Sequence, residues 1–331
     1  MRPVLRKLAA LAAGVVLLGG CHGGTRSNGA TVIGLTYVPN VQFSGIYLAL
    51  DNGNYSSHNL NVELRHHGND EGVFTALLSG DEQVVLATGD EVVQARSQGM
   101  DVISVATYYR EQPNVILTRK DTGIKTVADL KGKKVGIPGE YGSSWLALQA
   151  YLASANMTTS DVNVMSIGYT QTSALSKGDV DAIVGFANNE AVQLSAAGVD
   201  AQAVECDCTI PLVSASLVTT PQWAKEHTNE LKELLAATQE GMTTAVEHPD
   251  QAFAATKKRD TTLSDEKTSE TATKILTATN LLILGANSSV SLEQDASRWS
   301  EMLSFMSSIS GLLQQDVTLD EVMTNDYVPQ S

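Results

Sequence analysis

Aromatic, amide and carboxylate side chains recur directly after the short apolar runs of this sequence. Tyr37, Asn40 and Phe43 follow the first run, and Asp90 and Tyr108 follow two later runs. Further residues of this kind, with a glycine and two serines among them, are Tyr141, Gly142, Ser143, Ser144, Asn188 and Glu190. Only 5% of the chain is aromatic, so this concentration is informative. Such a set suits a flat heteroaromatic ring, because aromatic faces stack on it while amides and carboxylates bond its edge.

Simpler explanations exist for each residue taken alone. A single tyrosine can pack in a core or lie on a solvent-facing loop, and Asp90 can be a helix N-cap. The start of a helix at residues 142–144 offers free backbone N–H groups, which could hold an electronegative group instead. Taken as a set, the residues favour a ligand cleft.

Strand and helix patterns alternate along the chain, and this alternation is what would bring the residues together. We expect strands at 31–37, 62–65, 84–87, 102–107, 135–137, 162–166, 180–184 and 216–218. Helical spacing falls between them, at 43–50, 73–78, 91–97, 145–156, 173–176 and 189–197. Repeated βαβ units predict an α/β fold with mostly parallel sheets covered by helices. Ligands of such folds bind outside the carboxyl ends of the strands.

The pattern restarts near residue 126, which predicts two lobes. We expect lobe 1 to comprise residues 31–117 and 215–325, the latter containing a helical C-terminal region, and lobe 2 to be inserted at residues 118–214. Chain crossings near 117–120 and 213–216 would form a hinge. Two such lobes can close over a ligand.

The N-terminus has the features of an export signal. Arg2, Arg6 and Lys7 precede an apolar run from Leu8 to Leu18, which ends in Gly-Gly-Cys21. We predict a lipoprotein signal peptide at 1–20, lipid attachment at Cys21 and a flexible tether at 21–30. The alternatives are an ordinary signal peptide with an accidental cysteine, or an uncut membrane anchor. The prediction makes the protein extracytoplasmic, lipid-anchored to the outer face of the cytoplasmic membrane.

Charge, cysteine and histidine content indicate which kinds of partner and metal site the protein lacks. The formal net charge is −15, and it falls to −18 without residues 1–20, which carry three basic residues and no acidic one. We therefore expect no nucleic-acid partner. Cys206 and Cys208 could form a tight disulfide or stay as thiols. His66 and His67 are adjacent on a strand and face opposite sides, so we predict no metal site, and no cofactor.

Four segments resemble a known family: residues 37–43, 80–81, 129–139 and 188–190. They are similar to the periplasmic-binding-protein-like group that handles thiamine pyrimidine precursors, with relatives that bind riboflavin or alkanesulfonates. The Asp-Leu-Lys-Gly-Lys piece at 129–133 is common to many type II solute-binding proteins. Segments 37–43 and 188–190 are narrower and resemble the vitamin-precursor branch. The similarity runs over residues 31–325.

The resemblance implies a type II binding fold that delivers its ligand to an ABC permease and its ATPase. By position, it places Tyr37, Asn40, Phe43, Tyr108, Tyr141, Ser143, Ser144 and Glu190 in the cleft. Tyr37 stands where tryptophan is often found. We expect a monomer that captures a thiamine-related pyrimidine, with riboflavin or an alkanesulfonate as alternatives. A sulfonate would use the helix start at 142–144, with Arg110 in support.

One branch of the family is enzymatic. Fungal pyrimidine synthases use pyridoxal phosphate on a lysine and a cysteine-rich iron site. This chain has no lysine between Lys7 and Lys120, and its cysteines are sparse. We therefore predict a binding protein without enzymatic activity.

Overall fold

The computed structural model describes residues 29–68 and 71–329. The predicted signal peptide, Cys21 and the tether as far as residue 28 lie outside the described residues. Within them, no helix combines the length and the apolar composition needed to cross a bilayer.

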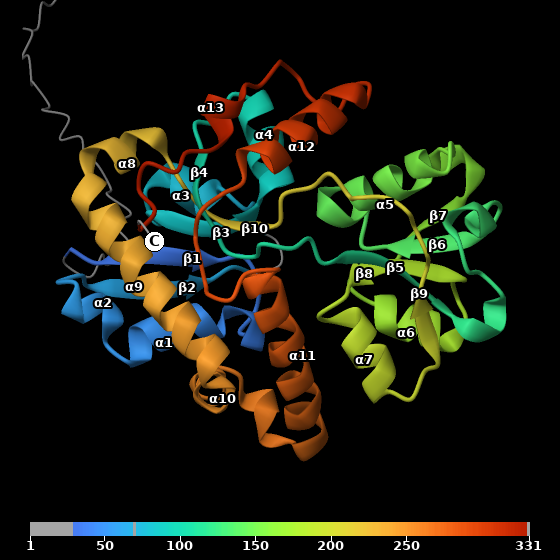
Figure 1. The fold of residues 1–331 in the computed structure, drawn as a ribbon, viewed down its shortest axis with the longest axis horizontal. Helices are drawn as coiled ribbons and strands as arrows, with labels where there is room; N and C mark the ends of the chain where they lie inside the picture. The colour runs from blue at the N-terminus through green and yellow to red at the C-terminus, as the bar shows by residue number, and fades with distance from the viewer. Residues whose placement is uncertain (1–28, 69–70, 330–331) are drawn as a thin grey trace, which may run out of the picture.

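The first sheet has five strands in the order β2-β1-β3-β10-β4 (Figure 1). Their bounds are β1 Thr31–Leu35, β2 Val62–His66, β3 Val84–Thr88, β4 Ile103–Thr107 and β10 Ala215–Thr219. β1 pairs in parallel with β2 and β3, whereas β10 runs antiparallel to β3 and β4. This sheet and the helices packed on it are called lobe 1.

The second sheet repeats this arrangement, with the order β7-β6-β8-β5-β9. Its strands are β5 Asn114–Arg119, β6 Lys134–Ile137, β7 Asn163–Ser166, β8 Ala182–Phe186 and β9 Ala201–Ala203. β5 is antiparallel to β8 and β9, and the other strands are parallel to one another. This sheet and its helices are called lobe 2. The predicted α/β class is confirmed, and both sheets are mixed: four strands of each run in one direction and the fifth, β10 or β5, runs antiparallel to them.

The chain passes between the sheets twice. Because β5 belongs to the second sheet, the first crossing lies between Thr107 and Asn114, ahead of the boundary expected at 117. The return crossing lies between Ala203 and Ala215, and the boundary expected at 214 falls at its end.

Helices cover both sheets, and only helices follow β10 in the described chain apart from an isolated bridge at Met323. The helices of lobe 1 that precede β10 are α1 Ser44–Asp51, α2 Asn54–Ser57, α3 Thr75–Ser79 and α4 Gly89–Ser97. Those of lobe 2 are α5 Gly142–Ser154, α6 Gln171–Lys177 and α7 Glu190–Ala196. The C-terminal set is α8 Pro221–Glu226, α9 Thr228–Glu247, α10 Pro249–Lys257, α11 Glu266–Leu284, α12 Ala296–Ser308 and α13 Leu319–Val322. Short 3₁₀ turns are η1 Val41–Phe43, η2 Lys120–Thr122, η3 Val127–Leu130, η4 Thr159–Asp161 and η5 Thr261–Ser264.

Local sequence explains several helix starts. Thr88 and Glu91 form a capping box that begins α4, because the Glu91 carboxylate accepts bonds from the Thr88 amide and hydroxyl. Thr220 caps α8 and Pro221 occupies its first turn. Thr126 and Asp129 form another capping box, which begins the short turn η3.

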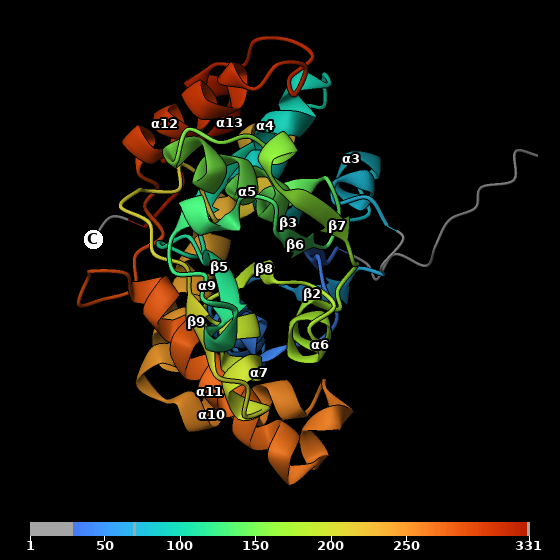
Figure 2. The same ribbon diagram turned by 90° about the vertical axis from the view of Figure 1, so that its right-hand side faces the viewer.

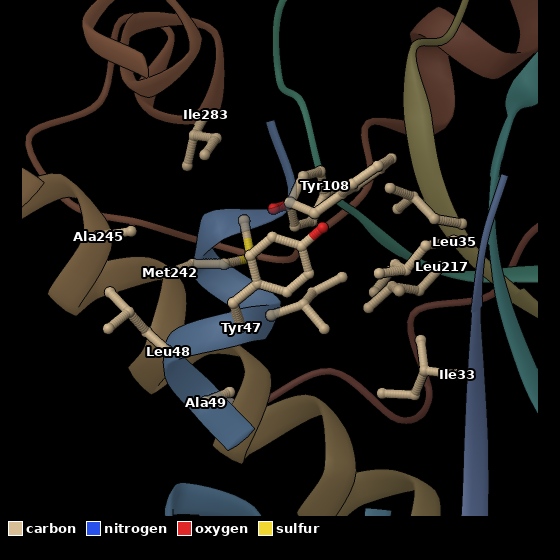
Figure 3. Close-up of a cluster of buried hydrophobic side chains, with 14 of the residues drawn as sticks. Ile33, Leu35, Tyr47, Leu48, Ala49, Tyr108, Leu217, Met242, Ala245 and Ile283 are labelled. Atoms are coloured by element: carbon tan, nitrogen blue, oxygen red, sulfur yellow. The ribbon is translucent and has the colours of Figure 1, made fainter. Parts of the chain in front are cut away.

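The core of lobe 1 forms where α1 and α9 pack closely together. A β-carbon on Gly241 would lie 2.4 Å from the Gly45 carbonyl oxygen, so glycine permits this backbone approach. Figure 3 shows the Tyr47 ring between Met242 of α9 and Leu217 of the sheet. This rigid packing holds the loop that follows β1, where the first predicted site residues lie.

Candidate functional site

A cleft of about 520 Å³ lies between the lobes. Its wall from lobe 1 comes from the loop after β1, the end of β3 and the segment after β4. Its wall from lobe 2 comes from the loops after β6, β7 and β8. Figure 2 shows these strands in the lobe that faces the viewer. Five aromatic residues line it: Tyr37, Phe43, Tyr109, Tyr169 and Phe186. The volume is within the range of about 300–1,000 Å³ typical of small-molecule sites.

Two tyrosines from different lobes meet in this cleft. The ring centroids of Tyr37 and Tyr169 are 6.4 Å apart, and their planes make an angle of 63°. Tyr37 follows β1 and is 40% exposed, and Tyr169 follows β7 and is 68% exposed. Exposed rings on both sides leave aromatic faces available to a flat guest.

Glu190 supplies a carboxylate at the first turn of α7. Its Oε2 accepts a bond of 2.7 Å from the Phe186 amide, and its Oε1 accepts one of 3.0 Å from the Asn189 amide nitrogen. A β-carbon on Gly185 would lie 2.8 Å from the Glu190 β-carbon, so glycine in β8 gives the side chain its place. Burial raises the pKa of Glu190. The pKa of Tyr37 is raised by burial and then by the charge of Glu190, and both residues line the same cleft.

Glu91 is a second acid in the lining, on the side of lobe 1. The capping box with Thr88 fixes its carboxylate, and burial raises its pKa. Among the described residues that line the cleft, the charged ones are Glu91 and Glu190, and the other polar groups are amides and hydroxyls. This lining favours a ligand that donates hydrogen bonds over one that carries negative charge.

Comparison with known proteins agrees with this geometry. The family described as NMT1/THI5 like matches residues 40–252. The chain belongs to this family. Riboflavin-binding protein RibY of Chloroflexus aurantiacus is 30% identical over 223 residues, which is 67% of this chain and 64% of RibY. The match thus spans slightly less than two thirds of that relative. The formylaminopyrimidine-binding protein of Halalkalibacterium halodurans is 25% identical, over 75% of this chain and 77% of that protein.

A solved structure supports the fold. The periplasmic aliphatic sulphonate-binding protein SsuA of Escherichia coli superposes with a TM-score of 0.71, covering 92% of this chain and 93% of SsuA. At 17% identity this likeness is one of fold. The type II periplasmic-binding-protein fold and the family that the sequence resembles are therefore confirmed.

Four of the predicted site residues line the cleft: Tyr37, Phe43, Ser144 and Glu190. Asn40 lies beside it, in an adjoining pocket. Tyr141 is 60% exposed outside the cleft lining, and Gly142 and Ser143 begin α5 without lining it.

Three other predicted residues are buried next to residues that line the cleft. Tyr108 is in the lobe 1 core, where its hydroxyl donates to the Gln42 carbonyl at 3.0 Å, while its neighbour Tyr109 lines the cleft. Asp90 is fully buried, while Glu91 lines the cleft. Asn188 is buried, and Asn189 lines the cleft. In each pair the lining residue is one position further along the chain.

Asp90 and Asn188 have distinct structural surroundings. Neither carboxylate oxygen of Asp90 has a hydrogen-bond partner among the described residues, and burial raises its pKa to about 7. The Asn188 amide donates to the Thr279 hydroxyl of α11 at 2.9 Å, and both side chains are buried. This hydrogen bond joins lobe 2 to lobe 1.

Several residues that line the interlobe cleft were not among the predicted site residues. The clearest are Tyr169, Phe186, Glu91 and Gln193. Tyr169 lies just after β7 and Phe186 is the last residue of β8, so the same carboxyl-end rule was their signal. Gln193 lies one turn inside α7, where helical polar residues carry no such signal.

The groups considered for metal or anion binding lie elsewhere. His66 contacts the Tyr37 carbonyl and the Tyr47 hydroxyl, whereas His67 contacts Glu82. Among residues 29–68 and 71–329, no three His, Cys, Asp or Glu residues form a metal-binding group. Arg110 donates to the carbonyls of Ser291 and Glu293 and lines a different pocket, which shares Tyr109 with the cleft. Cys206 and Cys208 are joined by a disulfide, with their α-carbons 5.2 Å apart.

Proposed function

We propose that this protein captures a flat heteroaromatic vitamin or vitamin precursor in the cleft between its lobes. The observation that carries the proposal is the pair of exposed tyrosines, Tyr37 and Tyr169, that face one cleft from opposite lobes. A planar ring lying against them would gain stacking energy from both lobes at once. Glu190 would accept hydrogen bonds from ring N–H or amine groups at its edge.

Two ligand types share this chemistry. The first is a thiamine-related pyrimidine, which the narrow motifs of the sequence favour. The second is riboflavin, which is supported by the 30% identity to RibY and by the cleft volume of about 520 Å³. That volume is more than one six-membered ring needs. An alkanesulfonate is disfavoured, because an anion would face Glu91 and Glu190 while Arg110 is engaged elsewhere.

The place of the protein in transport follows from the same proposal. A mature chain anchored through Cys21 outside the cytoplasmic membrane would deliver its ligand to an ABC permease, powered by a cytoplasmic ATPase. Closure of the lobes over the ligand would be the state that the permease recognises. The protein would act as a monomer and release its ligand chemically unchanged.

A ligand panel tests the proposal. The mature protein would be mixed with 4-amino-5-hydroxymethyl-2-methylpyrimidine, formylaminopyrimidine, riboflavin and an alkanesulfonate, and its unfolding free energy measured. A true ligand at a hundredfold excess over its Kd should stabilise the protein by about 2.7 kcal/mol. Stabilisation by the sulfonate alone would contradict the proposal. Recovery of a chemically altered pyrimidine would favour the synthase-like alternative.

A further inference from the structure

A second cavity of about 360 Å³ adjoins the cleft. We call it the side pocket: it is formed by η1, the start of α7, η5 and the first turns of α11. Figure 1 shows α7 and α11 side by side where the two lobes approach each other, and these helices are in contact. Asn189 and Gln193 of α7 line both the cleft and the side pocket. The two cavities are therefore neighbours across these two side chains.

The side chains that separate the two cavities, Asn189 and Gln193, are both amides. The Gln193 amide donates to the Asn189 side-chain oxygen at 2.8 Å, and the Thr172 hydroxyl donates to the Gln193 side-chain oxygen at 3.0 Å. Amide side chains offer both donors and acceptors, so they can exchange these bonds for bonds to a ligand that crosses between them. A hydroxylated chain is suited to such a crossing.

The side pocket has the chemistry of a site for a neutral polar chain. Its floor is apolar, with Leu263 and Ile275 buried. The pocket is also lined by the amide of Asn40 and by several threonine hydroxyls, including that of Thr271. Among the described residues that line it, the charged ones are Asp260 and Lys267, which are of opposite sign. With no net formal charge, the pocket favours a polyol over a phosphate or a sulfonate.

We infer that the side pocket is a subsite for a hydroxylated chain attached to the ring bound in the cleft. The ligand class is then a heteroaromatic ring with a polyol substituent, rather than a bare pyrimidine. This inference rests on the proposed function, because the cleft must first hold the ring.

Riboflavin and lumiflavin provide a matched pair of probes. They carry the same three-ring system, but lumiflavin has a methyl group where riboflavin has a five-carbon polyol. We expect the wild-type protein to bind riboflavin at least tenfold more tightly than lumiflavin. This comparison needs no variant, so it holds whether or not a substituted protein folds.

A substitution that fills the side pocket then tests whether this pocket causes the preference for riboflavin over lumiflavin. Thr271 lines the side pocket, and Thr273 is exposed on the same helix away from it. Each hydroxyl donates to a carbonyl four residues back, at 3.0 and 2.9 Å. Thr271→Phe should weaken riboflavin binding at least tenfold and change lumiflavin binding less than twofold. Thr273→Phe should leave both dissociation constants unchanged.

Each outcome separates the inference from the proposed function. Equal binding of the two flavins by the wild type, or equal weakening of both by Thr271→Phe, would overturn the inference while the ring site stands. Binding of a bare pyrimidine but of neither flavin would do the same. Binding of no heteroaromatic ligand would overturn the proposed function itself.

Discussion

Tyr37 and Tyr169 lie edge to face across the two lobes, with ring centroids 6.4 Å apart. Tyr37 is fixed by the end of a buried strand, β1, and Tyr169 by the loop after β7 on the other sheet. The two rings belong to different lobes, so any movement of one lobe relative to the other changes the space between them. Because the two rings are already in edge-to-face contact, a planar ligand would lie against the pair rather than between them.

Removing either ring should weaken ligand binding without unfolding the protein. Tyr37→Ala and Tyr169→Ala should each cost about 0.5–1.5 kcal/mol of binding energy, which is a Kd increase of about 2- to 12-fold. Because Tyr37 is 40% exposed and Tyr169 is 68% exposed, the melting temperature should change little. Leu281→Ala is the control, since Leu281 is 65% exposed and does not line the cleft. A larger loss of affinity from Leu281→Ala than from Tyr169→Ala would contradict the assignment.

Binding should also depend on the charge of Glu190. Its pKa is raised by burial, so it takes up a proton as the pH falls through this raised value and then loses its acceptor strength. We expect ligand affinity to fall with decreasing pH. Glu190→Gln should bind more weakly by about 1.5–3 kcal/mol and show a flatter pH profile between neutral and acidic pH. Calorimetric titration across this range measures both effects.

Glu140→Gln provides the comparison for Glu190, because Glu140 is exposed on the same lobe outside the cleft lining. It should bind the ligand as the wild type does at every pH. If the pH profile of Glu190→Gln matched that of the wild type, another group would carry the pH dependence.

The free energy of unfolding of the ligand-free protein should fall as the pH rises from about 4 to about 7, because of Asp90. Burial raises its folded-state pKa to about 7, above its ordinary value. The folded state therefore binds more protons than the unfolded state in this window, and its stability is lost as the pH rises through it. Asp90→Asn should reduce this loss and be more stable than the wild type at pH 8, while Glu91, whose pKa burial also raises, contributes the remainder.

Asp320→Asn is a closely matched control for Asp90→Asn. Thr318 and Glu321 form the same capping box at α13 that Thr88 and Glu91 form at α4, with the aspartate at the same position. Asp320 is exposed, so its substitution should leave the pH dependence unchanged. Urea unfolding at pH 5 and pH 8 measures both variants. Equal behaviour of the two would mean that burial of Asp90 does not govern the stability profile.

Much of the fold follows from sequence pattern, but the strand Asn114–Arg119 does not. The alternation of strands and helices gives nearly every parallel strand, because a βαβ unit leaves a local signature. β5 lies at a chain crossing and pairs antiparallel with β8 and β9, which are distant in sequence. β9 has only three residues. Neither strand has a local pattern that shows its partner, so the expected lobe boundary fell inside β5.

The candidate site shows a similar limit at the level of single residues. The carboxyl-end rule places the correct loops at the cleft, and Tyr37, Phe43, Ser144 and Glu190 line it. In three loops, however, the lining residue is the neighbour of the predicted one, as Tyr109 is of Tyr108. Which of two adjacent side chains faces the cleft depends on backbone geometry at the strand end. That geometry is set by tertiary packing rather than by residue type.

The buried hydrogen bond between Asn188 and Thr279 should favour association of the lobes. Thr279→Val keeps the shape of the side chain but leaves the Asn188 amide without this acceptor, at a cost of about 1–3 kcal/mol in the associated arrangement. We expect weaker ligand binding and a larger radius of gyration in X-ray scattering. Thr277→Val is the control, because Thr277 is exposed on the same helix and donates to the Thr273 carbonyl. Unchanged affinity in Thr279→Val would show that lobe association does not depend on this contact.

Membrane attachment should depend on Cys21. Without its thiol, Cys21→Ser cannot accept a lipid, so the exported protein should leave the membrane fraction. Cell fractionation followed by immunoblotting measures the distribution. Cys206→Ser is the control, because this cysteine is disulfide-bonded within the folded chain and should not affect localisation. Continued membrane association of Cys21→Ser would indicate an uncut membrane anchor.

A crystal structure of the protein with the tightest-binding heteroaromatic ligand of the panel tests the central claim most directly. We expect the ring to lie in the interlobe cleft against Tyr37 and Tyr169, with its edge within hydrogen-bonding distance of the Glu190 carboxylate. A ligand bound outside the cleft, or inside it without contact to either tyrosine, would contradict the account.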